Sequence, residues 1–294
     1  MKRAFLQLHI AVFLAGFTGI LGRLISLNEG MLVWYRLLIT SITLWAIWIF
    51  KKNKSVPRRK EIIKIIGVGA IAALHWLSFY GSIKYANVSI ALVCFSAIGF
   101  FTAVFEPLIF RKRADIYEVL LGLLVMAGIA CIFQFDPAYK TGIIVGLISA
   151  LLGAIFPIFN RKLLEKNSVD GITLFELSGG FIFLSFLMPL YLHFFPVKSF
   201  IPGKEDILWL LVLSWVCTVI AFNLSMQALR KISAFTVNLS YNLEPVYGIL
   251  LAFLLYREDK NLHGGFYLGL FLVVLAVALQ MWRLRAIHRR NPQA

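Results

Sequence analysis

Polar residues gather in one stretch of an otherwise apolar part of the chain. Six of the nine residues over 236–244 are polar, although the run around them is long enough to cross a lipid bilayer. Polar side chains cannot face lipid without a large penalty, so they must face a cavity or a neighbouring helix. Helical spacing puts Asn238, Tyr241 and Asn242 on neighbouring parts of one face. We expect these three to line a cavity, the alternative being hydrogen bonds that join helices.

Glu244 continues this polar face and is the one carboxylate that the sequence places near the middle of a membrane. Such a group can bind the ammonium group of a substrate or take up a coupling proton. The alternative is a structural, protonated glutamate bonded to a neighbouring helix. Pro245 follows directly and frees a helix carbonyl, which predicts a kink and an extra acceptor. Pro157 predicts the same beside Phe156.

His75 lies in the middle of another apolar run, with Ser78 and Ser82 on the same helical face. It is a candidate for substrate binding or coupling, against a purely structural hydrogen bond. Arg36 lies about 9 Å inside one end of its segment by helix rise. It can act as a gate, or it can extend its charged end to the surface or to neighbouring carbonyls.

Further candidates fall into two groups. Amide and hydroxyl side chains can line the path of a small polar molecule, and flat aromatic rings can stack on one. The first group contains Asn223, Gln227 and Ser96. The second contains Trp76, Tyr80, Phe156 and Trp215.

Ten apolar runs must position these residues. Of the 294 residues, 60% are hydrophobic and only 15% are charged, whereas soluble domains carry about 25% charged residues. A bilayer core needs about 20 apolar residues per helix, and runs of this length are too long for barrel strands. We therefore predict an all-α integral membrane protein with ten transmembrane helices. The predicted spans are 5–26, 31–50, 62–84, 88–110, 116–133, 142–160, 172–193, 206–229, 234–256 and 262–282.

The positive charge is distributed unequally between the two sets of alternating loops. One set, together with both termini, holds 20 Lys and Arg, and the other holds seven. Basic residues concentrate on the cytoplasmic side, so both termini are expected in the cytoplasm, most simply across a bacterial inner membrane. The net charge of +15 then needs no nucleic-acid partner. Membrane lipids are expected around the chain.

The chain shows weak internal similarity at an offset of 146 residues. The segment 83–88 falls on 229–234, and Phe110 and Arg111 fall on Tyr256 and Arg257. Five helices are an odd number, so the second copy starts on the opposite side of the membrane and the repeats are inverted. We predict one five-helix unit over 1–138 and a second over 139–294.

Several motifs resemble those of the drug/metabolite transporter superfamily, EamA type. They are the aromatic residue and arginine at Tyr35 and Arg36, the turn over 228–234, and the Leu-Glu-Pro-Val sequence over 243–246 followed by Glu258. The resemblance implies a ten-helix secondary transporter, an exporter or exchanger of small organic metabolites such as amino acids, working by alternating access. It implies a central cavity lined by the first, third, fourth, sixth, eighth and ninth helices, with the fifth and tenth outside.

Other functions fit the sequence less well. A lipid or lipid-linked flippase of the same fold is the first alternative. An intramembrane enzyme needs paired acids or a His and a carboxylate at close spacing, which the spans do not offer, and a channel needs a filter signature. We expect no catalytic residue, no metal and no cofactor. We expect the substrate to be a small molecule and the protein to be a monomer or homodimer. The three cysteines lie in apolar runs and are interpreted as buried apolar residues.

Overall fold

The computed structural model describes residues 2–52, 55–135, 137–197, 199–232, 234–241 and 243–290, and within these ranges all regular structure is helical. Among the described residues, eight helices are long and apolar enough to cross a membrane. Two shorter apolar helices, Glu244–Tyr256 and Gly264–Gln280, accompany them in the described part of the chain. Uninterrupted apolar runs form helices because helices satisfy every backbone polar group internally.

The helices follow one another with short connections. Their ends agree with the predicted spans within three residues, except that the last helix continues to Arg290. In chain order they are α1 (Lys2–Leu24), α2 (Glu29–Phe50), α3 (Arg59–Tyr85), α4 (Val88–Phe95), α5 (Ile98–Phe110), α6 (Ile116–Phe135), α7 (Lys140–Leu163), α8 (Val169–Phe194), α9 (Lys204–Ser214), α10 (Ala221–Leu229), α11 (Ala234–Tyr241), α12 (Glu244–Tyr256) and α13 (Gly264–Arg290), with short turns at Pro137–Tyr139, Trp215–Ile220 and Glu258–Asn261.

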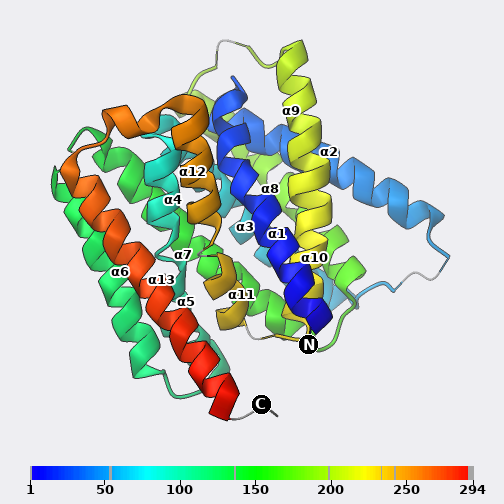
Figure 1. Ribbon diagram of the computed structural model, residues 1–294. Helices are drawn as coiled ribbons and strands as arrows, with labels where there is room; N and C mark the ends of the chain where they lie inside the picture. Colours follow the sequence, from blue (N-terminus) through cyan, green and yellow to red (C-terminus); the bar gives the residue numbers. More distant parts are fainter. Residues whose placement is uncertain are drawn as a thin grey trace.

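The start of α1 and the end of α13 lie at the same end of the bundle (Figure 1). We call this end the terminal side, and we call the opposite end, where α1 finishes at Leu24 and α12 finishes at Tyr256, the distal side. Helices α6 and α13 lie together along one edge. They meet closely, since a Cβ atom built on Gly128 would lie 2.7 Å from the carbonyl oxygen of Gly269.

Two predicted spans are interrupted. The segment 88–110 divides into α4 and α5, and the segment 234–256 divides into α11 and α12. All four helices begin and end at positions that differ by the same 146 residues. Both pairs also finish alike, because Arg111 and Arg257 adopt left-handed conformations with φ of 53° and 54°. The two interruptions bring helix ends into the interior of the bundle, where helix dipoles and unpaired backbone groups can meet a ligand.

Helices α3 and α8 cross at very short range. A Cβ atom on Gly69 would collide with the backbone carbonyl of Glu176, and one on Gly180 would lie 2.8 Å from the carbonyl oxygen of Gly69. Small residues at such a crossing let two backbones approach and pack, which is the main source of helix association in lipid. This crossing fixes α3, which carries several of the candidate residues.

One turn of π-helix, Trp215–Ile220, joins α9 to α10. Its wider winding replaces the regular i→i+4 hydrogen bonds by i→i+5 bonds. The hydroxyl of Thr218 donates to the carbonyl oxygen of Leu213 at 2.8 Å. The same hydroxyl accepts a hydrogen bond from Nε of Arg36 at 2.7 Å. The π turn therefore supplies a binding partner for a buried cation.

Candidate binding cavity

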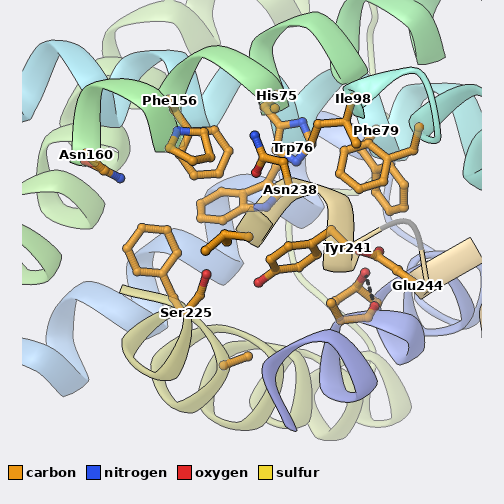
Figure 2. Close-up of a pocket in the computed structure, with 18 of the residues that line it drawn as sticks. His75, Trp76, Phe79, Ile98, Phe156, Asn160, Ser225, Asn238, Tyr241 and Glu244 are labelled. Atoms are coloured by element: carbon orange, nitrogen blue, oxygen red, sulfur yellow. Dashed lines mark hydrogen bonds between the residues drawn. The ribbon is translucent and has the colours of Figure 1, made fainter. Parts of the chain in front are cut away.

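A pocket of about 790 Å³, its open mouth included, lies between the two halves of the bundle. Residues of α1, α3, the α4 and α5 pair, α7, α10 and the α11 and α12 pair line it, together with Arg36 of α2. These are the first, third, fourth, sixth, eighth and ninth predicted spans plus one residue of the second. Figure 2 shows several of the lining residues, among them His75 of α3 and Glu244 of α12.

Arg36 is the buried cation of this cavity, with 2% of its surface exposed. Its Nε donates to Thr218 and its Nη1 donates to the hydroxyl of Tyr80 at 2.9 Å. The guanidinium carbon lies 4.2 Å from the ring centre of Trp76. Arg36 forms no ion pair with any described carboxylate. A guanidinium fixed by neutral partners keeps its charge available to an anionic group.

Glu244 is the first residue of α12 and is 4% exposed. Its carboxyl group lies near Arg36 and interacts with the side chain of Thr18. The amino end of a helix favours negative charge. Tight packing of α1 against α12 holds this group in place, because a Cβ atom on Gly16 would lie 3.1 Å from Cβ of Tyr247. The cavity therefore contains an acidic and a basic side chain that are not paired with each other.

Aromatic rings form the wall beside these charges (Figure 2). Phe156 and Phe222 stack at 6.4 Å with an interplanar angle of 15°, and Trp76 meets Phe222 at 6.3 Å. His75 is fixed by Nδ1, which lies 2.9 Å from the carbonyl oxygen and 3.0 Å from the hydroxyl of Ser149. Its ring packs on Phe156 at 5.6 Å.

The polar face of α11 points into the cavity at two of its predicted positions. Asn238 donates to the hydroxyl of Thr102 at 2.9 Å, and Tyr241 lies near Ser225 of α10. Both line the pocket, and Figure 2 shows them between the aromatic wall and Glu244. Asn242, the third residue predicted on this face, lies outside the described residues.

Comparison with known proteins identifies the family. The model of the EamA-like transporter family matches residues 2–134 and again 140–282. The chain belongs to the EamA-like transporter family. It is thus a multi-pass membrane protein of the drug/metabolite transporter superfamily.

Relatives and solved structures agree with this membership. An uncharacterized transporter of Haemophilus influenzae is 24% identical over 286 residues, which cover 90% of this chain and 89% of the relative. An uncharacterized transporter of Archaeoglobus fulgidus is 24% identical over 266 residues, with coverage of 87% and 89%. A solved crystal structure superposes with a TM-score of 0.70 at 16% identity and covers 98% of this chain and 99% of its own. That structure has the same fold.

Five predicted site residues of this EamA protein lie outside the cavity lining. Tyr80 is fully buried behind the cavity lining, and its hydroxyl accepts a hydrogen bond from the lining residue Arg36. Ser96 is bonded to the carbonyl of Leu92 at 3.3 Å and lies in a separate small pocket. The other three, on α10 and the π turn, face other directions.

Asn223 and Gln227 form a chain of amides that ends on α1. Gln227 donates to Asn223 at 2.5 Å, and Gln7 donates to Gln227 at 2.6 Å. Asn223 opens into a different crevice, between α2, α8 and α10. Trp215 is 46% exposed on the outer surface and donates to the hydroxyl of Thr43 at 3.0 Å. These side chains join helices instead of facing the cavity.

Sequence reasoning missed six polar or aromatic residues of the lining. They are Thr18, Phe79, Phe95, Asn160, Phe222 and Ser225. Asn160 donates to the carboxyl oxygen of Glu176 at 2.9 Å, so a second fully buried carboxyl group adjoins the cavity lining. In the sequence, each polar residue of this set is visible only as a single polar position in its own apolar run. Only the three-dimensional arrangement shows that these positions meet at one cavity.

Cysteine scanning tests whether the cavity of this EamA transporter is open to water. In a variant without the three native cysteines, Asn238→Cys and Ser225→Cys are expected to react with small hydrophilic thiol reagents because both positions line the pocket. Val274→Cys and Ala278→Cys are matched controls on the exposed face of α13, where lipid excludes the reagent. Equal protection at all four positions would show that the polar residues only join helices.

Proposed function

We propose that this chain is a secondary transporter, an exporter or exchanger, that carries small zwitterionic metabolites such as amino acids by alternating access. The observation that supports this most directly is the pair of opposite charges in one cavity, Arg36 and Glu244, with an aromatic wall beside them. Pockets with a few polar groups fixed among apolar ones orient a small ligand.

Arg36 is suited to a carboxylate. Guanidinium carries five N–H donors in a rigid fork that matches carboxylate geometry. The contacts with Thr218 and Tyr80 use Nε and Nη1. Donors that remain can bind an anionic group of the substrate, and the charge-assisted hydrogen bonds are strong in a poorly solvated site. Trp76 at 4.2 Å keeps the guanidinium plane in one orientation.

Glu244 is suited to an ammonium group, or to a proton that exchanges with it. It lies in the same lining as Arg36 and at the interrupted part of the α11 and α12 pair. In transporters with inverted repeats, the substrate site is formed by discontinuous helices near the middle of the membrane. A zwitterion placed between the two side chains would satisfy both charges.

The proposed architecture is ten spans in two inverted five-helix repeats, over 1–138 and 139–294. The common offset of 146 residues between the two interrupted helix pairs supports it. Alternating access then follows from motion of one half against the other around the cavity.

A binding screen tests the substrate class. Purified protein is heated with an amino acid, with its decarboxylated amine and with its deaminated acid. A ligand at 100 times its dissociation constant stabilises a protein by about 2.7 kcal/mol. We expect the zwitterion to raise the melting temperature more than either analogue, and uptake into proteoliposomes to follow the same order. Equal effects of all three compounds, or lipid flipping without solute uptake, would contradict the proposal.

Reporter fusions test the orientation, which rests on the basic loops of the terminal side. Fusions after Lys54 and after Arg290 are both expected to report the cytoplasm, and a fusion after Phe195 on the distal side is expected to report the exterior. Opposite signals from the first two would contradict the inverted ten-span arrangement, and exterior signals from both would contradict the orientation.

A further inference from the structure

The carboxylate of Glu258 joins three elements at the distal side. Glu258 follows α12, is 2% exposed and forms an ion pair with Arg23 at the end of α1. It also accepts hydrogen bonds from the first turn of α4, namely from the backbone N–H groups of Val88 at 3.2 Å and Ser89 at 2.9 Å and from the hydroxyl of Ser89 at 2.6 Å. Because carboxylates stabilise helix amino ends, this contact ties the second half of the chain to the first.

Other contacts at the distal side hold the end of α1. Tyr256 donates its hydroxyl to the carbonyl oxygen of Ile20 at 3.0 Å, and its ring lies 4.4 Å from the guanidinium of Arg23. Lys84 of α3 donates to the carbonyl oxygen of Ile25 at 2.7 Å. The contacts of Tyr256 join the two halves, as those of Glu258 do, whereas the bond from Lys84 holds the segment after α1 against α3 within the first half. This end of the bundle is therefore closed by polar bonds around Glu258.

The cavity begins on the inner side of this closed distal end and extends from there toward the terminal side. Its lining residues nearest the distal side, Thr18, Arg36 and Phe79, lie six or seven residues from the distal ends of their helices. That is about 10 Å of helix rise. In the other direction the lining reaches Leu229, the last residue of α10, and Asn160 near the end of α7.

The corresponding place on the terminal side carries the opposite charge. At the offset of 146 residues, Lys112 corresponds to Glu258, and Lys112 follows Arg111, whose backbone is in the left-handed conformation. The start of α11 corresponds to the start of α4. An ammonium group cannot accept hydrogen bonds from a helix amino end and is repelled by its dipole. Arg161, near the end of α7, donates to the carbonyl oxygen of Leu229 at 2.5 Å.

We infer that Glu258 is a clamp that holds the distal side shut, and that Lys112 leaves the terminal side without one. The ligand-free transporter therefore rests with its cavity open to the terminal side, and opening of the distal side requires Glu258 to leave Arg23 and the first turn of α4. A difference in local charge between the two halves sets the resting state of the carrier.

Thiol modification of a cavity residue measures this balance without any substrate. Ala15 lines the cavity and is small, so Ala15→Cys in the cysteine-free variant serves as the probe. Membrane-impermeant reagent is added from the distal side in sealed vesicles. Glu258→Gln is expected to raise the rate at least tenfold, since it removes the ion pair and presents an amide N–H group to donors. Asp259→Asn removes the same charge one residue later and should leave the rate unchanged.

Two further variants keep the test decisive if Glu258→Gln does not fold. Arg23→Gln removes the partner, whose side chain is 42% exposed, and is expected to raise the distal rate about fivefold. Lys112→Glu supplies a carboxylate at the position that corresponds to Glu258 and should slow modification from the terminal side severalfold relative to Lys112→Gln. If the folded variants, verified by size exclusion and melting, keep the rates of Asp259→Asn and Lys112→Gln, the clamp does not exist. That result would leave the proposed substrate class untouched.

Discussion

Glu244→Gln is expected to fold normally and to lose most zwitterion binding and transport. The amide keeps the volume of the side chain and an oxygen for the interaction with Thr18. It removes the negative charge from a residue that is 4% exposed and shares a cavity with Arg36. A hydrogen bond to a charged group contributes about 1.5–3 kcal/mol, which corresponds to a loss of affinity of roughly 10- to 100-fold.

Binding and flux measured on the same variant separate the possible roles of Glu244. A substrate-ammonium role predicts that Gln and Ala variants both lose binding of zwitterionic ligands. A proton-coupling role predicts that the Gln variant still exchanges substrate but loses net flux driven by a pH gradient. Full flux with unchanged pH dependence in the Gln variant would contradict both roles and leave a structural one.

Glu176→Gln is the matched control for Glu244→Gln. Glu176 is also a fully buried carboxyl group in an apolar helix, but it is bonded to Asn160 and is not part of the cavity lining. Its replacement is expected to leave the dissociation constant within about threefold of wild type. An equal loss in both variants would show that binding depends on buried carboxyl groups in general and not on Glu244.

Of the methyl groups that could be added to α3, the one introduced by Gly69→Ala is expected to lower the stability of the protein most. The new Cβ would collide with the backbone carbonyl of Glu176, and backbone cannot move aside as a flexible side chain can. Overpacking of a tight core costs about 1–3 kcal/mol, and a contact with backbone belongs at the upper end of this range. We expect a clear fall in melting temperature in detergent and a lower yield of monodisperse protein.

Gly67→Ala is the internal control, two residues away on the same helix. No atom lies within 4 Å of a Cβ built on Gly67. Alanine also has the higher helix propensity, by about 1 kcal/mol, so this variant should be as stable as wild type or slightly more stable. If both variants melt at the same temperature, the close approach of α3 and α8 is not what holds this crossing together.

The helical fold was largely predictable because hydropathy is a direct consequence of the lipid environment. Long apolar runs must be helices, and all ten predicted runs are helical over most of their length. The interruptions were less predictable. Pro245 indicates one in the segment 234–256, where α12 starts at the residue before it. Gly99 stands at the equivalent position of the segment 88–110, and no proline signals the interruption there.

The cavity was predictable where polar residues cluster and unpredictable where they are scattered. Asn238, Tyr241 and Glu244 stand together in an apolar run, and the structure places all three in the lining. Asn223 and Ser225 are two residues apart on α10, and only Ser225 faces the cavity. A helix that is apolar on most sides gives no signal for its rotation, so the sequence could not choose between the two.

The π turn at 215–220 also has a consequence for aligning this chain with other sequences. One wider turn contains an additional residue, so every position after it is rotated by about 100° relative to an unbroken α-helix. The offset of 146 residues that relates the two halves on the C-terminal side of this turn should therefore become 145 on its N-terminal side, because α3 has no such turn. A homologue with a regular helix here needs a one-residue gap, and an ungapped alignment would assign the wrong side chains to its cavity.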